Sequence, residues 1–319
     1  MPQNKRTIKP IDLTKVRTYS IRGRKNRTRV KAFGRPMAAV DRADFFESLP
    51  DFLKASDFNE FIARVAKARK NRRPFHLLLG AHTIKVGLSP VINDLMRRGI
   101  VTGVSLNSAG LIHDVELAFW GETSEDVQAG LENGSFGMVK ETAEVVAAVG
   151  QLASEKSIGL GEAAGSYLHT VKARFRKHSI FATAHELGLP ATVHVGIGTD
   201  IVSQQPDFNA AQLGEASHVD FRILSSICRD INRGGAVANI GSAVILPEVF
   251  LKALTVARNV YGGGGDLTTA NFDMIMHYRP RVNVVDRPTF KSGKGFNFVG
   301  HHEIMIPLLA WGLRKKFKK

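Results

Sequence analysis

The segment 104–116 gathers residue types that could bind a ligand and move protons. Its apolar run ends in the small polar stretch Asn107–Gly110, and His113 and Asp114 follow in the next predicted helix. Small residues at the end of a strand let a ligand approach the backbone, and the N–H groups opening the next helix attract anions. We therefore predict a binding site here, with His113 or Asp114 as the proton-transfer group, although acids also favour a first helical turn for dipole reasons.

Two later segments repeat this design. The runs 193–200 and 237–243 also end in glycine and small polar residues. Because such ends share one edge of a parallel sheet, the three together predict a single ligand crevice, while each alone also fits an ordinary turn between strand and helix. Asp200 follows the second run and either accepts a ribose hydroxyl or caps the next helix. A dinucleotide fingerprint GxGxxG is absent.

A lysine-bearing loop near the C-terminus is the third chemical feature. Lys294 lies between glycines in Ser292-Gly293-Lys294-Gly295. Such a lysine contacts a phosphate or, if desolvated, forms a Schiff base, and a plain surface loop is the alternative interpretation. The chain has no HExxH motif and no Cys–His set, so we predict no metal site.

Strands and helices must alternate to position these residues. The segment 75–106 is typical of a strand–helix–strand unit, with Pro90 at the first helical position. Further strands are predicted at 191–197, 236–240 and 281–285, and a C-terminal helix at 304–313. This pattern favours an α/β fold with a doubly wound, mostly parallel, Rossmann-like sheet. We predict an extended basic arm over residues 1–43 and one domain over 44–319.

The positive charge of the chain is concentrated in its tails. The net charge is +15, and residues 1–35 hold 12 Lys and Arg against Asp12 alone, while the last six residues hold five. Subtracting these from the 44 basic and 29 acidic residues of the chain leaves 27 and 28 in segment 36–313. The body is therefore nearly neutral, and nucleic acid is a candidate partner only through the tails.

Other global features exclude several classes. No apolar run approaches the roughly 20 residues of a membrane helix, and no apolar signal-peptide core follows the polar N-terminus. The single cysteine, Cys228, excludes an intramolecular disulfide and fits a buried thiol. We expect a cytoplasmic protein with no membrane partner.

The order of these motifs resembles the deoxyhypusine synthase family, and the opening 10–19 is similar to its bacterial deoxyhypusine-synthase-like branch. The resemblance spans roughly 10–313. It implies a Rossmann-like fold, NAD as cofactor, and a homotetramer with sites between subunits. The cofactor-binding residues that it implies, together with their neighbours, are Asn107, Ser108, Ala109, Gly110, Thr199, Asp200, Gly241, Ser242, Ala243 and His301.

In that family NAD oxidises a polyamine and a lysine holds the aminobutyl group as an imine. The matching lysine here is Lys294, with Lys291 as the alternative. The chain departs from the pattern where the family has polyamine-binding or catalytic residues. His113-Asp114 replaces a Glu pair, Gln205 a carboxylate, and Pro247 a histidine; His301 replaces a nucleotide-binding Asp. Each lost carboxylate removes a charge-assisted hydrogen bond to an ammonium.

The sequence therefore predicts an NAD-dependent transferase that acts on an amine or polyamine through a lysine imine, with a donor or acceptor other than that of true deoxyhypusine synthesis. Two alternatives stay open. The first is a non-catalytic oligomer that binds NAD or another nucleotide. The second is an RNA-associated protein that acts through its basic tails.

Overall fold

A computed structural model describes residues 45–206 and 208–317. Contacts between residues divide the chain into two units, Met1–Ala55 and Ser56–Lys319. Of the first unit the structure describes helix α1 (Phe45–Ser48) and the opening of α2 (Leu53–Lys70). The predicted arm over 1–43 lies outside the described residues. The account below concerns the second unit.

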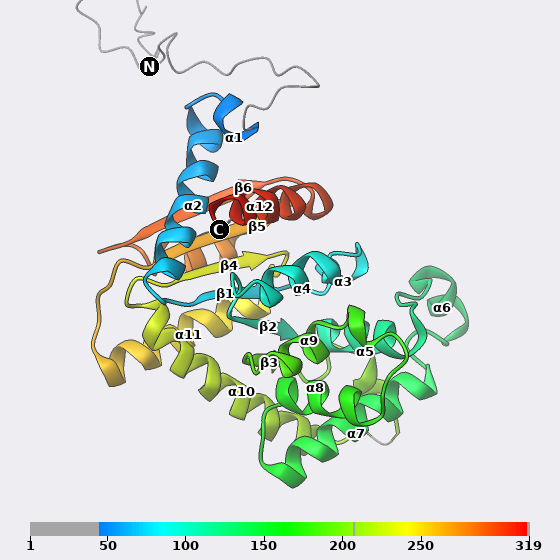
Figure 1. Cartoon of the computed structure of the whole chain (residues 1–319). Coiled ribbons are helices and arrows are strands. Elements are labelled where there is room, and N and C mark those ends of the chain that lie inside the picture. The colour runs from blue at the N-terminus through cyan, green and yellow to red at the C-terminus, as the bar shows by residue number, and fades with distance from the viewer. Residues whose placement is uncertain (1–44, 207, 318–319) are drawn as a thin grey trace, which may run out of the picture. The chain divides into compact units, whose positions relative to one another are not determined.

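Six parallel strands form one sheet in the order β3-β2-β1-β4-β5-β6 (Figure 1). The α/β, doubly wound, Rossmann-like prediction is confirmed. The strand bounds are β1 (Phe75–Leu79), β2 (Gly103–Asn107), β3 (Ala191–His194), β4 (Ala236–Ile240), β5 (Thr268–Asp273) and β6 (Lys294–Val299). Strands β2 and β3 lie on one side of β1, and β4, β5 and β6 lie on the other. The direction in which successive strands are added therefore reverses between β1 and β4. Ligands of such sheets bind beyond the carboxyl ends at this switch point.

Helices connect the strands. Their bounds are α3 (His82–Lys85), α4 (Ser89–Arg97), α5 (Ser108–Trp120), α6 (Val127–Asn133), α7 (Lys140–Lys156), α8 (Leu160–Thr170), α9 (Ile180–Glu186), α10 (Ala210–Ile231), α11 (Ile245–Tyr261) and α12 (His302–Lys316). Short 3₁₀ turns are η4 (Arg176–His178) and η5 (Ile201–Gln204), and η6 (Pro280–Asp286) is a π-helix. None of the helices in the described residues is long and apolar enough to cross a membrane.

Two apolar clusters hold the sheet between its helices. On one face α10 and α11 pack against β1 and β4 through a buried cluster that includes Leu78, Phe250 and Cys228. The α2 side chain of Phe61 is fully buried and its ring contacts those of four other phenylalanines: Phe75, Phe272, Phe296 and Phe298. Burying each such ring contributes roughly 2–3 kcal/mol. Helix α2 therefore ties β1 to β5 and β6.

The predicted strand at 281–285 is wrong, because these residues form η6. Pro280 opens the turn, and the amide of Asn283 donates to Glu248 Oε1 at 2.8 Å, while Val284 and Val285 are buried. A short buried apolar run looks alike in strand and helix, so its periodicity did not distinguish them. The two strands that flank this segment, β5 and β6, were not predicted.

Candidate functional site

The carboxyl edge of the sheet brings together the three predicted ligand-binding segments. Asn107 ends β2 and is paired with His194 at the end of β3, while Ile240 ends β4 beside Leu79 of β1. The segments that follow these strands therefore lie along one edge, as a shared crevice requires. At the switch point the backbones of Gly80 and Gly241 touch, since a Cβ built on Gly80 would lie 2.1 Å from the Gly241 carbonyl oxygen.

Asp200 is held at this edge by two hydroxyl groups. Ser108, at the start of α5, donates to its Oδ2 atom. The Thr199 hydroxyl, in the loop after β3, donates to the Gly196 carbonyl oxygen at 2.7 Å and makes a longer contact of 3.3 Å to the same Oδ2 atom. Burial raises the pKa of Asp200, while these hydrogen bonds and the nearby His113 lower it in part. Within the described residues no hydrogen bond reaches Oδ1, so this oxygen can accept one from a ligand.

A cavity of about 530 Å³ opens beside Asp200. This volume lies within the range of small-molecule sites. Its walls mix apolar residues with carboxylates from α5, the segment 122–125 and the loop after β3. The lining residues include Ala109, His113, Glu116, Trp120, Glu122, Glu125, Asp200 and Lys85.

A chain of hydrogen bonds fixes the orientation of the His113 ring in the wall of the cavity. Its Nδ1 atom lies 2.6 Å from Thr123 Oγ1, and Thr123 donates its hydroxyl hydrogen to Glu116 Oε2. Thr123 therefore accepts from Nδ1–H, which leaves Nε2 unprotonated in the neutral ring. Burial alone would raise the pKa of Glu116, but the hydrogen bonds from His113, Thr123 and Thr142 lower it, so Glu116 stays ionised.

A second group of polar residues lies at the switch point. His302 is 1 % exposed; its Nε2 lies 3.3 Å from the Phe272 carbonyl oxygen and 3.9 Å from Asp273 Oδ1. Its ring contacts that of His82, which opens α3, at a centroid distance of 5.6 Å. Gly241 has a left-handed φ of +68°, and a Cβ there would lie 3.0 Å from the His302 ring. Gly241 thus makes room for an imidazole as well as for a turn.

Sequence reasoning missed this group. It selected His301, which is exposed at the N-cap of α12 with Nδ1 3.8 Å from Glu303, and passed over the buried His302 beside it. The adjacent pair of histidines was the available signal. Which of the two side chains faces inward depends on how α12 is rotated about its axis relative to the sheet. The tertiary structure sets this rotation.

Asp114 points away from the cavity. The carboxylate is fully buried and accepts hydrogen bonds from Ser179 Oγ and from the Ile180 backbone N–H at 2.8 Å. Burial raises its pKa to about 6. Its contacts link the start of α9 to α5. The carboxylate is therefore part of the packing between these helices and does not face the cavity.

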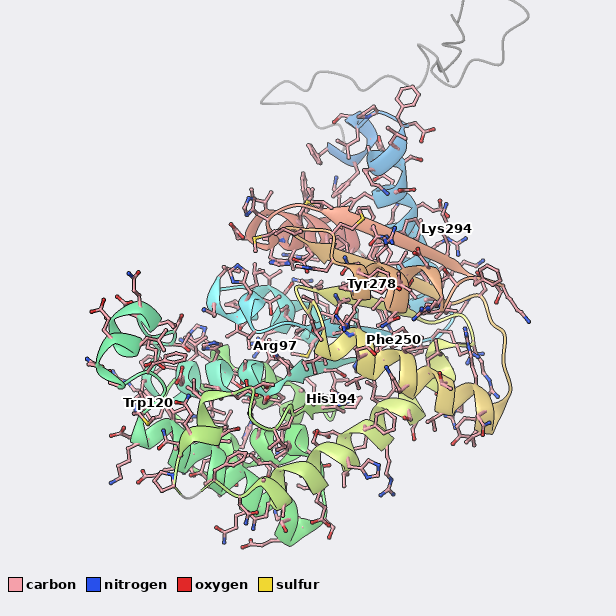
Figure 2. The ribbon with its side chains drawn as sticks, turned by 180° about the vertical axis from the view of Figure 1, so that it is seen from behind. Arg97, Trp120, His194, Phe250, Tyr278 and Lys294 are labelled. Carbon is pink, nitrogen blue, oxygen red and sulfur yellow. The ribbon has the colours of Figure 1, made fainter. Side chains whose placement is uncertain are left out.

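Lys294 lies at the opposite edge of the sheet. It begins β6 and is paired with Thr268, the first residue of β5, while its ammonium donates to Glu60 on α2. Six strand residues separate the two edges, or about 20 Å. Figure 2 shows Lys294 and the cavity residue Trp120 on opposite sides of the molecule. The structure therefore does not bring this lysine together with Asp200 and His113.

The remaining predicted residues lie at the carboxyl edge in supporting positions. Asn107 Oδ1 accepts from the Gly110 N–H at 3.0 Å and so caps α5, and Ser242 Oγ accepts from the Leu246 N–H at 3.2 Å at the start of α11. Ala243 lies in the loop after β4, half-buried. Gly110 packs on the Leu106 side chain, where a Cβ would lie 2.9 Å away.

The residues at this edge fit a nucleotide cofactor. Asp200 Oδ1 can accept a sugar hydroxyl, and a Cβ on Gly198 would meet nothing within 4 Å, so the loop beside it is open. Among the described residues, no group of three His, Cys, Asp or Glu side chains could hold a metal ion.

No family model matches the sequence, and no curated protein matches it. Solved structures do. AgrE, in a ternary complex with ornithine and NAD⁺, is 13 % identical with a TM-score of 0.54 over 82 % of this chain and 33 % of that one. ArgZ, an arginine dihydrolase from cyanobacteria, is 14 % identical with a TM-score of 0.51 over 83 % and 33 %.

A protein from Entamoeba histolytica described as a deoxyhypusine synthase is 10 % identical with a TM-score of 0.52, and the match covers 84 % of this chain and 90 % of that one. The chain spans about a third of the length of AgrE and ArgZ. At these identities the likeness concerns the fold alone. The chain has a deoxyhypusine-synthase-like fold, as the sequence resemblance implied.

Proposed function

We propose that the chain is an NAD-dependent enzyme that acts on a small amine at the carboxyl edge of its sheet. The observation that carries this proposal is the convergence of the Asp200 carboxylate and the His113 imidazole on one cavity beside the ends of β2 and β3. Likeness in fold to AgrE, which was crystallised with NAD⁺ and ornithine, supports the pairing of cofactor and substrate class.

Asp200 has the chemistry to hold the nucleotide. Its Oδ2 atom is fixed by Ser108 and Thr199, so Oδ1 keeps one direction and accepts a sugar hydroxyl without reorganisation. When bound, NAD supplies an acceptor for a hydride. The open loop at Gly198 and the small residues Ser108 and Ala109 leave space for the cofactor along this edge.

The cavity has the charge to attract an amine. Glu116, Glu122, Glu125 and Asp200 line it against the single ammonium of Lys85. A protonated amine has no lone pair to assist the loss of a hydride from the adjacent carbon, so the amine must first lose a proton. The unprotonated Nε2 of His113 accepts this proton, and Glu116 stabilises the resulting charge through Thr123.

Titration of NAD into the protein by calorimetry tests the first half of this proposal. Asp200→Asn removes a charge-assisted hydrogen bond worth about 1.5–3 kcal/mol, so NAD affinity should fall by about tenfold to a hundredfold. Glu155→Gln, at an exposed position on α7, is the matched control and should bind as the wild type does. Wild-type protein that binds no NAD would refute the proposal.

NADH formation with a panel of diamines, polyamines and basic amino acids tests the second half. His113→Gln should retain NAD affinity and lose turnover, since glutamine cannot take up the proton. Equal turnover in His113→Gln would remove His113 from the chemistry. The assay also separates this proposal from its alternative, in which NAD binds but no amine reduces it.

Three positions favour that non-catalytic alternative. Lys294 lies at the far edge, Gln205 Nε2 donates to the Gly137 carbonyl oxygen at 2.6 Å, and Pro247 lies in the first turn of α11. Residues that hold and modify polyamine in the family are thus replaced here by structural contacts. Tight NAD binding without NADH formation with any amine in the panel would favour a nucleotide-binding oligomer.

A homotetramer remains part of the proposal. The segment after β5 exposes Ile275, Met276 and Tyr278 by 65, 50 and 63 %, close to the end of the sheet at which the site lies. Apolar side chains gathered in this way are typical of subunit contacts. Light scattering of the purified protein measures the assembly, and a monomer at micromolar concentration would contradict it.

A further inference from the structure

A groove at the amino edge of the sheet is unrelated to the amine site. It encloses about 630 Å³. Its walls come from α2 and from the segments that lead into three strands: Arg73 precedes β1, Arg233 precedes β4, and Asp266 precedes β5. Because the strands are parallel, all three segments lie at the edge opposite the carboxyl ends.

The groove gathers positive charge that the nearly neutral body does not predict. Four cations line it, Arg64, Lys67, Arg73 and Arg233, against two carboxylates. Arg64 and Lys67 are one helical turn apart on α2, whereas Arg73 and Arg233 come from loops far apart in the sequence. The fold therefore assembles a basic surface from three parts of the chain.

The two carboxylates in the groove are already engaged. Arg64 donates to Glu60 Oε1 at 2.8 Å and to Asp266 Oδ1 at 3.3 Å, so its guanidinium is held by both. Glu60 also accepts from Lys294, and the hydrogen bonds from Lys294 and Arg64 lower its pKa. These contacts fix Arg64 in the wall and leave no carboxylate of the groove for Lys67 or Arg233.

Lys67 and Arg233 supply the charge that is not neutralised. Both side chains are exposed, and within residues 45–206 and 208–317 neither makes a hydrogen bond or an ion pair of 4 Å or less. Arg233 acts on a carboxylate only at longer range, where its charge helps to lower the pKa of Asp230. Arg73 has only a long contact of 3.9 Å to Asp230, whose carboxylate also binds Arg229 at 2.9 Å. Three cations in one groove thus have little or no compensation, which costs stability through mutual repulsion unless an anion binds.

Not every basic residue of this region belongs to the surface. Arg69 donates to the carbonyl oxygens of Gly99 and Arg73 at 2.6–3.1 Å, and burial lowers its pKa. It lies in the last turn of α2, where the helix macrodipole favours a positive charge. The positive charge of Arg69 is therefore satisfied at the end of this helix, whereas Lys67 and Arg73 line the groove.

We propose that this groove binds the phosphodiester backbone of a single-stranded nucleic acid, independently of base sequence. Guanidinium groups match phosphate oxygens in fork geometry, and lysine supplies a point charge. In the part of the chain that the structure describes, the only apolar residues that line the groove are Ala63 and Ala68, so none of its described side chains can stack on a base or insert into a bilayer. The 12 basic residues among the first 35 add positive charge to the chain, which favours a polyanion over a single phosphate as the ligand.

Fluorescence anisotropy of the full chain with a labelled 20-nucleotide RNA or DNA, over a series of salt concentrations, tests this. Each phosphate contact contributes about 0.7 to the slope of log K against log salt for single strands. Lys67→Glu with Arg233→Glu should therefore reduce the slope by about 1.4 and weaken binding at every salt concentration. Lys177→Glu with Arg222→Glu, two exposed cations elsewhere, makes the same charge change and should keep the wild-type slope.

Acetylation of lysines followed by mass spectrometry gives a second, residue-specific result. RNA should protect Lys67 and leave Lys177 reactive. Unchanged slope in the groove variant, or equal acetylation of Lys67 with and without RNA, would refute the proposal and leave the tails as the binding element. Binding to vesicles of anionic lipid without binding to RNA or DNA would also refute it. If the glutamate variant fails to fold, Lys67→Gln with Arg233→Gln replaces it.

Discussion

The pH dependence of stability can show whether the carboxylate of Asp114 has a structural or a catalytic role. Its side chain is fully buried, and burial raises its pKa to about 6 from 3.8. Because the folded protein holds the proton more tightly than the unfolded chain, Asp114 adds stability at low pH that is lost as the pH rises through 6. The full penalty for the ionised form is about 3 kcal/mol, since each pKa unit corresponds to about 1.4 kcal/mol.

Asp114→Asn cannot titrate and therefore removes this dependence. Linkage gives a change of about 1.4 kcal/mol between pH 5 and pH 8 in the stability of the wild type relative to this variant, with the wild type relatively less stable at pH 8. Urea unfolding followed by circular dichroism at constant ionic strength measures it. Asp126→Asn, which changes an exposed carboxylate at the N-cap of α6, controls for the loss of a capping charge.

The opposite result has a definite meaning. If the difference in unfolding free energy between the wild type and Asp114→Asn is the same at pH 5 and pH 8, the pKa of this carboxyl is not raised in the folded protein, and the argument from burial is wrong. Loss of NADH formation in that same variant would then restore Asp114 as a proton-transfer group. Retained turnover with the expected pH dependence would fix its role as a link between α5 and α9.

Three further substitutions test the placement of other residues. Gly241→Ala should cost at least 1 kcal/mol more than Gly99→Ala in thermal unfolding, since both have a left-handed φ but only the Cβ at 241 meets His302. His194 is buried with its pKa lowered to about 4, so falling pH removes the stability that its neutral ring contributes; between pH 8 and pH 5 the wild type should lose about 2 kcal/mol of unfolding free energy relative to His194→Gln. Lys294→Ala should change the unfolding free energy by less than about 1 kcal/mol, because its ion pair is half-exposed, and should leave NAD affinity unchanged. Equal costs of the two glycine variants, a difference between the wild type and His194→Gln that does not change with pH, or loss of NAD binding in Lys294→Ala would contradict the respective placement.

The sequence predicted well where local patterns and burial agree. The runs 75–80 and 236–240 became β1 and β4 because short apolar segments between turn residues suit buried parallel strands. β5 and β6 were missed because Thr268–Asp273 and Lys294–Val299 carry polar residues and glycine, so their strand conformation comes from pairing with neighbours. Pairing partners are distant in sequence and leave no local signal.

The candidate site also has residues that the sequence predicted and residues whose positions only the tertiary structure decided. Ser108 and Asp200 were selected because each follows an apolar run, and parallel strands carry such ends to a common edge. The role of His113 depended on Thr123 and Glu116, whose hydrogen bonds fix its tautomer. Helix phase decided between His113, which faces the cavity, and Asp114, which faces α9.

The sequence by itself determined the class of fold, the edge of the sheet that carries the candidate site and the concentration of charge in the tails, because each depends on the order of residue types along the chain. Tertiary structure alone decided which side chains meet. It placed Lys294 at the amino edge of the sheet, opposite the edge that carries Asp200, and packed His302 against Gly241. It also brought Lys67 and Arg233 to one groove, although more than half of the sequence separates them. These outcomes depend on strand direction, helix phase and packing, which a linear pattern does not encode.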